Sequence, residues 1–183
     1  MTEKEKMLAG LYYYAYDEEL VRDRERAKKL CKLLNEQSDG SLEDRSIILK
    51  ELLQTEQNCW IESPFRCDYG YNIKLGKNFY ANFNCVILDC NLVTIGDNVL
   101  FAPNVQVYTA THPVNVADRI AGKEMAYPIE IGDNVWIGGG SIILPGVKIG
   151  ENTVIGAGSV VTKPIPSNSV AVGNPCRVIK QIS

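Results

Sequence analysis

Histidine is nearly absent from this sequence, because His112 is the only one among 183 residues. The six cysteines include no pair in a Cys-x-x-Cys arrangement, whereas structural zinc sites are built from closely spaced cysteines and histidines. We therefore expect no structural zinc site, and small buried thiols are the simpler interpretation of the cysteines.

Long apolar runs and a strong excess of one charge are also missing. The apolar stretches are far shorter than the roughly 20 residues that a membrane-spanning helix needs. The net charge of −3 gives no basis for binding nucleic acid. Because the N-terminus lacks the basic and then apolar layout of a signal peptide, we expect a cytoplasmic protein that binds neither membrane nor nucleic acid.

Residues 1–57 are rich in charge and favour helices. Asp17 is a suitable N-cap for a helix that reaches about Asn35. The apolar stripe of this helix consists of Leu20, Ala27, Leu30 and Leu34. A short helix is expected before it, and Ser41 or Asp44 would cap another one after it. The sequence therefore predicts an N-terminal helical segment.

From residue 58 onwards a period of six replaces the helical pattern. β-Branched aliphatic residues recur at Ile131, Ile137, Ile143, Ile149, Ile155 and Val161, and glycine follows four of them. An earlier run, from Leu75 to Val93, is offset by two residues, which an insertion near Asn91 would explain. Neither a helix nor an ordinary strand has this period, so it predicts three short strands per coil, with about 18 residues in each turn. Residues 58–183 are expected to stack such coils around an aliphatic core.

One stretch interrupts the repeat without changing its register. Val107 and Ile131 are 24 positions apart, which is one step of six plus 18 further residues. Residues 109–127 show no repeat, so we expect them to leave the coil as an extruded loop. Long loops on rigid scaffolds are often functional.

His112 lies at the base of this loop. A hydroxyl group is a poor nucleophile at neutral pH and needs a base to remove its proton. Histidine suits that task, and general-base assistance typically contributes about 10²–10⁴ in rate. His112 is therefore the candidate catalytic base, although a lone histidine is more often structural or simply exposed.

Several segments resemble the maltose and galactoside O-acetyltransferases of the hexapeptide-repeat superfamily. They are residues 68–73, 79–84, 109–114, 134–139 and 173–178. The resemblance covers nearly the whole chain and implies a left-handed parallel β-helix with an N-terminal helical segment and one extruded loop. The galactoside type has a serine where Asp68 stands and an acidic residue where Cys90 stands, so this chain departs from it. Asp68 and Glu124 resemble the maltose type.

The resemblance also implies an activity and a set of site residues. Acetyl-CoA would be the co-substrate, a sugar such as maltose, glucose or a galactoside the acceptor, and no metal would be required. His112 would be the base, Asn82 would stabilise the oxyanion, and Asp68, Asn82 and Glu124 would bind the acceptor. The residues matched to the acetyl-CoA site are Trp136, Gly139, Ala157, Thr162, Lys163, Arg177 and Lys180. A homotrimer with sites between its subunits is also expected.

Other functions are compatible with a β-helix. It can serve as a non-catalytic binding or scaffold protein, because fold does not fix function. An acetyltransferase of this fold can also act on an acceptor that is not a sugar. A metal enzyme resembling the γ-class carbonic anhydrases is disfavoured, because those enzymes bind zinc through several histidines and this chain has one.

Overall fold

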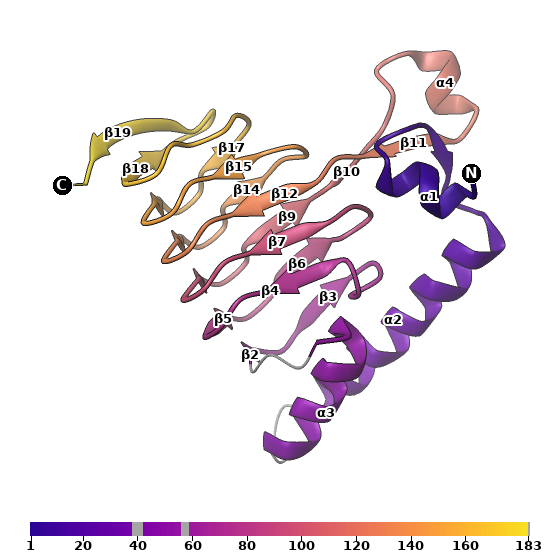
Figure 1. The fold of residues 1–183 in the computed structure, drawn as a ribbon, viewed down its shortest axis with the longest axis horizontal. Coiled ribbons are helices and arrows are strands. Elements are labelled where there is room, and N and C mark those ends of the chain that lie inside the picture. Colours follow the sequence, from indigo (N-terminus) through magenta and orange to yellow (C-terminus); the bar gives the residue numbers. More distant parts are fainter. Residues whose placement is uncertain (38–41, 56–58, 183) are drawn as a thin grey trace.

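The computed structural model describes residues 1–37, 42–55 and 59–182, which form a stack of coils with three flat faces (Figure 1). Each face is a sheet, and its neighbouring strands run parallel except for the antiparallel pair β18 and β19. The chain visits the three faces in rotation, so one coil contributes one strand to each. The predicted parallel β-helix is therefore confirmed.

The strands divide among three sheets. The four-stranded sheet contains β4 (Ile73–Leu75), β7 (Val93–Ile95), β12 (Ile129–Ile131) and β15 (Lys148–Ile149). The seven-stranded sheet contains β2 (Cys59–Ile61), β5 (Phe79–Ala81), β8 (Leu100–Phe101), β13 (Trp136–Ile137), β16 (Val154–Ile155), β18 (Ser169–Val172) and β19 (Arg177–Gln181). The five-stranded sheet contains β3 (Phe65–Cys67), β6 (Cys85–Leu88), β9 (Gln106–Tyr108), β14 (Ile142–Ile143) and β17 (Val160–Val161).

The period of six corresponds to one inward side chain per face. Ile131 pairs with Ile95 and Ile149 in neighbouring coils, and all three side chains are buried. The offset near Asn91 is also present, because the turn between β6 and β7 is two residues longer than the six-residue step allows. Stacked aliphatic columns inside the three faces form the core, and parallel pairing satisfies the backbone between coils.

Asparagines line the corner between the four-stranded and seven-stranded sheets. They are Asn78, Asn98, Asn134, Asn152 and Asn168, each with positive φ. The side-chain amide of each of the first four donates a hydrogen bond of 2.8–3.0 Å to the amide oxygen of the next asparagine, and Asn168 accepts the last of these bonds. Asparagine tolerates the left-handed conformation, so the same residue type serves both the turn and the ladder.

Three helices precede the coils: α1 (Glu3–Leu8), α2 (Glu18–Glu36) and α3 (Leu42–Leu53). Asp17 caps α2 through a bond from the Glu19 N–H at 3.0 Å, and the predicted apolar stripe of α2 is buried, so this prediction is confirmed. Asp44 lies inside α3, so its prediction as an N-cap was wrong, whereas Ser41 lies outside the described residues. The predicted boundary after residue 57 also falls outside them.

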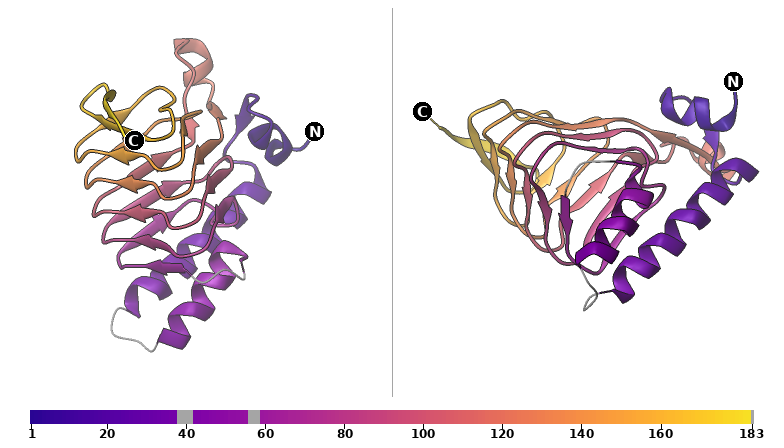
Figure 2. Two further views of the ribbon diagram at one scale, coloured as in Figure 1. Left: turned by 60° about the vertical axis from the view of Figure 1, so that its left-hand side comes forward. Right: turned by 60° about the horizontal axis from the view of Figure 1, so that its bottom comes forward.

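The helical segment packs beside the first coil, as Figure 2 shows from two directions. Arg45 of α3 is buried and donates to the carbonyl groups of Ile61 at 2.6 Å and Leu34 at 3.1 Å. One side chain thus joins α3 to both α2 and β2.

Residues between β9 and β12 leave the prism as predicted. They contain β10 (Ala110–Thr111), α4 (Val116–Ile120) and β11 (Lys123–Ala126). β11 pairs antiparallel with β10 and also with β1 (Tyr13–Tyr14), so the extruded loop and the N-terminal segment lie side by side (Figure 1). The coil resumes in register at β12, because the added chain leaves and re-enters at one corner and does not displace the strands.

Candidate active site

His112 follows β10 directly and its side chain is exposed. Pro113, the next residue, is buried and turns the chain away from the hairpin. Within the loop the Arg119 guanidinium donates to the carbonyl of Pro113 at 2.9 Å, and Lys123 forms an ion pair with Asp118 at 2.7 Å. The loop therefore has its own internal bonds, and it presents an imidazole that a ligand can reach.

The extruded loop leaves from the corner between the five-stranded and four-stranded sheets. The first turn at this corner, residues 68–72, is organised by Asp89, whose side chain is fully buried. That carboxylate accepts bonds from the N–H groups of Asp68 at 3.0 Å, Tyr69 at 2.8 Å and Asn72 at 3.3 Å. Burial raises the pKa of Asp89 to about 7, against these bonds, which favour the ionised form.

A pocket of about 380 Å³ opens at this corner and brings Asp68 and Glu124 together. The Cys90 thiol donates to Asp68 Oδ2 at 3.3 Å, and the Tyr13 hydroxyl donates to Glu124 Oε2 at 3.1 Å. Ala110, two residues before His112, is also part of the wall. The pocket thus offers two carboxylates beside the strand that leads into the histidine.

Ionisation in this pocket follows from its burial. Burial raises the pKa of Asp68 and holds the pKa of the Cys90 thiol well above its ordinary value. Cys90 is therefore a protonated hydrogen-bond donor rather than a thiolate nucleophile. The Arg24 guanidinium, which donates to the Tyr69 hydroxyl at 2.8 Å, also lines the pocket and adds one positive charge.

Sequence reasoning missed Tyr13 and Arg24 as members of this pocket. Both come from the N-terminal segment, and Tyr13 lies 111 positions from its partner Glu124. The repeat does not extend to that segment, so no periodic signal could place these side chains. The excess of tyrosines at positions 12–16 was the available hint, and only Tyr13 among them is buried.

Asn82 lies at a different corner. It follows β5, between the seven-stranded and five-stranded sheets, and its Oδ1 accepts the N–H of Phe83 at 2.8 Å. Gly139 and Ala157 occupy the same corner in later coils, where the Gly158 N–H bonds to the Gly139 carbonyl at 2.8 Å. A Cβ at Gly139 would lie 3.1 Å from the Pro103 carbonyl oxygen, so a larger residue at this position would crowd the neighbouring coil.

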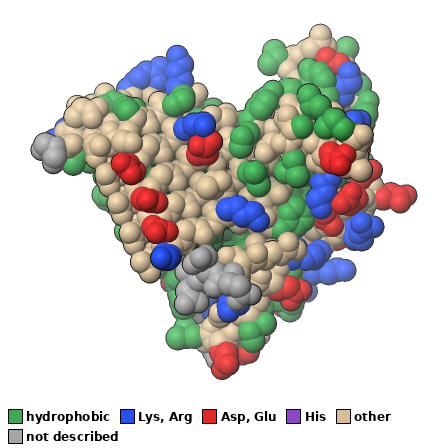
Figure 3. Space-filling model, in the orientation of Figure 1, with side chains coloured by type: hydrophobic (Ala, Val, Ile, Leu, Met, Phe, Trp, Pro, Cys, Tyr) green, Lys and Arg blue, Asp and Glu red, His purple; other side chains and the backbone are tan. Residues whose placement is uncertain are grey.

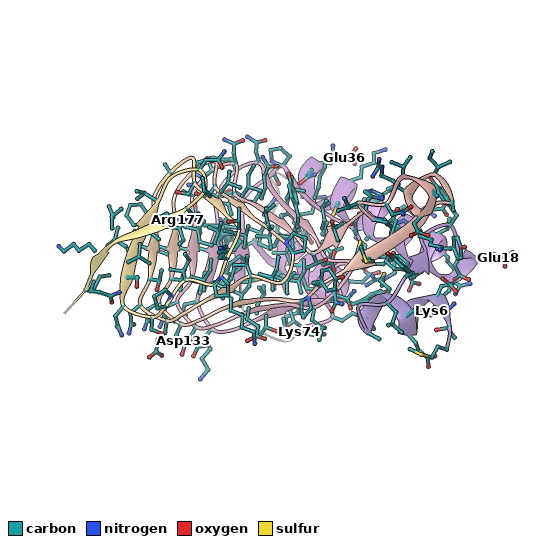
Figure 4. The ribbon with its side chains drawn as sticks, turned by 90° about the horizontal axis from the view of Figure 1, so that it is seen from above. Lys6, Glu18, Glu36, Lys74, Asp133 and Arg177 are labelled. Carbon is teal, nitrogen blue, oxygen red and sulfur yellow. The ribbon has the colours of Figure 1, made fainter. Side chains whose placement is uncertain are left out.

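The other candidates for acetyl-CoA binding are spread over the later coils. Trp136 projects outward from β13 and is 53% exposed. Thr162 and Lys163 follow β17, whereas Arg177 and Lys180 belong to β19, and all four are exposed. Figure 4 shows Arg177 on the opposite side of the β-helix from Lys74 and Asp133. Within one chain, the predicted site residues therefore lie on several faces and corners.

A larger hollow of about 900 Å³ lies on the outer face of the four-stranded sheet, on the side drawn in Figure 3. Its walls include the Glu130 and Lys148 side chains, which form an ion pair at 2.7 Å, together with Pro128 and Pro164. None of the predicted site residues lines it. Size alone therefore does not identify the site, and the smaller pocket beside the loop has the relevant chemistry.

The described part of the chain offers neither a cluster of metal ligands nor a membrane-spanning helix. No group of three or more His, Cys, Asp or Glu side chains among those residues could hold a metal ion. None of the described helices combines the length and apolar character needed to cross a membrane.

The fold and the loop define a transferase of the hexapeptide-repeat class. Two family models match: the bacterial transferase hexapeptide over residues 128–163 and the maltose acetyltransferase hexapeptide capping motif over residues 6–56. A candidate acetyltransferase of Dictyostelium discoideum is 53% identical over 182 residues, which is 100% of this chain and 95% of the relative. The chain belongs to the maltose and galactoside O-acetyltransferase family, and it is an acetyltransferase of that type.

Solved structures agree with this assignment. A maltose O-acetyltransferase from Clostridium difficile 630 superposes with a TM-score of 0.98 at 58% identity, covering 100% of this chain and 98% of that one. A galactoside acetyltransferase in complex with coenzyme A superposes with a TM-score of 0.96 at 48% identity, covering 100% and 92%. The predicted family is confirmed.

Proposed function

We propose that this protein transfers an acetyl group from acetyl-CoA to a hydroxyl group of a sugar, with His112 as the general base. The observation that carries the proposal is the placement of the single histidine. His112 is exposed, and Ala110, two residues before it in the chain, lines a pocket that holds two carboxylates. The coenzyme A bound to the similar galactoside acetyltransferase supports the choice of donor.

A sugar suits the acceptor pocket for chemical reasons. Its hydroxyl groups can donate hydrogen bonds to the carboxylates of Asp68 and Glu124, which are already oriented by Cys90 and Tyr13. A pocket of about 380 Å³ has room for a monosaccharide unit.

The reaction would proceed without an acyl-enzyme. His112 removes the proton of the acceptor hydroxyl while that oxygen attacks the thioester carbonyl carbon. The carbonyl oxygen becomes an oxyanion, which accepts a hydrogen bond from the Asn82 amide. The C–S bond then breaks, the sulfur of coenzyme A leaves as a thiolate, and the protonated imidazole returns its proton to that sulfur. The Phe83 N–H donates to Asn82 Oδ1 and so holds the amide, whose Nδ2 group would donate to the ligand.

A second copy of the chain would complete the site. Asn82 and His112 lie at different corners of one chain, so an interface between copies would be needed to bring the two side chains together. We propose the homotrimer that the family resemblance implies, and this placement is compatible with it. Small residues at Gly139 and Ala157 would let the pantetheine arm lie close to the backbone. The exposed cations Lys163, Arg177 and Lys180 would contact the phosphates of coenzyme A. A cytoplasmic location remains our prediction.

The test is release of coenzyme A thiol from acetyl-CoA, measured against maltose, glucose, glucosides and galactosides, with wild type and His112→Ala. Sugar-dependent turnover that falls by about 10² or more in a folded variant supports the proposal. Turnover only with alcohols that are not sugars would transfer the activity to another acceptor class. If acetyl-CoA neither binds nor turns over, the binding or scaffold function is favoured instead.

A further inference from the structure

Asn91 has a polar side chain and is almost fully buried, with 2% of its surface exposed. Its Nδ2 group donates to the carbonyl oxygens of Ala126 at 2.9 Å, Met7 at 3.0 Å and Leu8 at 3.2 Å. Its Oδ1 accepts the N–H of Leu92 at 2.7 Å. Burial of an amide is costly unless it is hydrogen-bonded, and here both ends of the amide are satisfied. One side chain therefore joins the end of α1, the end of β11 and the turn before β7.

The end of β11, which the Asn91 side chain holds, is also one end of the extruded loop. Ala126 ends β11 and pairs with Ala110 of β10, which leads directly into His112. At the other end, the Asn91 N–H donates to Thr109 Oγ1 at 2.9 Å, and that hydroxyl donates to the Leu88 carbonyl at 2.7 Å. These hydrogen bonds hold the loop at its base, whereas His112 itself is exposed.

We infer that Asn91 is a positioning residue for His112 and that, through it, α1 supports the loop that carries the base. The inference rests on the proposed role of His112. Without the Asn91 amide, the Ala126 carbonyl loses the donor that Asn91 supplies, and the Met7 carbonyl keeps only the Gly10 N–H at 3.2 Å, inside a buried cluster. The hairpin base then has to shift or admit water. Because a misplacement of about 1 Å at a reacting group can cost about 10²-fold in rate, a small shift is enough to be measured.

A matched control exists elsewhere in the chain. Asn35 also fastens a helix to a strand: its Nδ2 donates to the Phe65 carbonyl at 3.0 Å, and its Oδ1 accepts the Phe65 N–H at 2.8 Å. It joins α2 to β3 and makes no contact with the loop in those bonds. Asn35→Ala should therefore lower stability without affecting the chemistry.

The first measurement is steady-state acetyl transfer by Asn91→Ala, Asn91→Asp and Asn35→Ala. Asn91→Asp keeps the acceptor for the Leu92 N–H but removes the donors, so it should behave like Asn91→Ala. We expect kcat to fall about tenfold or more in both Asn91 variants, with the KM for acetyl-CoA within about twofold of wild type. Asn35→Ala should keep kcat within about twofold. A kcat of the Asn91 variants equal to that of Asn35→Ala would overturn the inference.

The second measurement does not depend on activity. Because the chain has a single histidine, the imidazole signals in an NMR spectrum report His112 without assignment work. The signals should shift or broaden in Asn91→Ala and remain in place in Asn35→Ala. Unchanged signals in Asn91→Ala would contradict the positioning role, even if His112→Ala showed that the histidine is not catalytic. Should Asn91→Ala fail to fold, Thr109→Val removes the other tie to Asn91 and should change the same signals.

Discussion

The asparagine ladder allows a stability prediction in which backbone strain and hydrogen bonds are separated. Asn134 lies in the middle of the ladder at φ +57°. Its Oδ1 accepts from Asn98 Nδ2 at 3.0 Å, and its Nδ2 donates to Asn152 Oδ1 at 2.9 Å. Replacing Asn134 removes both bonds, and the replacing residue decides whether the positive φ is also strained.

The magnitudes follow from these two terms. Each net hydrogen bond contributes about 0.5–1.5 kcal/mol, so both substitutions at Asn134 lose about 1–3 kcal/mol. Asn134→Gly tolerates the positive φ but adds about 0.5–1 kcal/mol from the greater freedom of the unfolded chain. Asn134→Ala instead adds about 1–2 kcal/mol for the left-handed conformation. We therefore expect Asn134→Ala to be destabilised at least as much as Asn134→Gly, with losses of roughly 2–5 kcal/mol and roughly 1.5–4 kcal/mol respectively.

The assay is denaturant unfolding of both variants and wild type at one fixed protein concentration, because association of subunits adds a concentration-dependent term. If both variants stay within about 0.5 kcal/mol of wild type, the ladder contributes nothing. A stability of Asn134→Ala above that of Asn134→Gly would show that the turn does not demand a positive φ.

Three further predictions concern the site. Ala157→Phe, at an exposed corner, should raise the KM for acetyl-CoA about tenfold or more, because the ring would occupy the space proposed for the pantetheine arm; an unchanged KM would place the donor elsewhere. Glu124→Gln keeps an oxygen for the Tyr13 hydroxyl but loses the charge, so the KM for the acceptor should rise while the KM for acetyl-CoA stays constant. Equal rises in both KM values would refute the assignment of Glu124 to the acceptor. Burial raises the pKa of Asp89 from 3.8 to about 7, so the wild type should lose stability as pH rises from about 4 to about 7. Asp89→Asn should not show this loss. In unfolding experiments, the free energy of unfolding of the wild type should fall between pH 5 and pH 8 by roughly 2–3 kcal/mol more than that of Asp89→Asn. An equal change in both proteins would mean that Asp89 does not titrate in this range.

The repeat made the β-helix predictable, because each coil encodes its own inward positions. Ile131, Ile137 and Ile143 are each buried on a different face, as the step of six requires. The loop was predictable for the same reason, since the pattern stops after Val107 and resumes in register at Ile131.

The pocket beside the loop was harder to predict because its contacts are not periodic. Asp68 and Glu124 were expected from the family resemblance, and the structure does bring them together. The bond from Tyr13 to Glu124 and the role of Asn91 depend on how the N-terminal segment docks, which no local pattern specifies. Asp44 was mistaken for a cap because side-chain type alone does not show where a helix begins.

The measurement that tests the central claim most directly is a comparison of two titrations. One is the pH dependence of kcat for sugar acetylation, and the other is the NMR titration of the single imidazole in the complex with coenzyme A and acceptor. If His112 is the general base, kcat should fall towards acid pH along the same curve on which the imidazole gains its proton, and His112→Ala should lose both that limb and about 10² or more in kcat. An acid limb displaced by more than about one pH unit from the imidazole titration, or one retained in His112→Ala, would contradict the account.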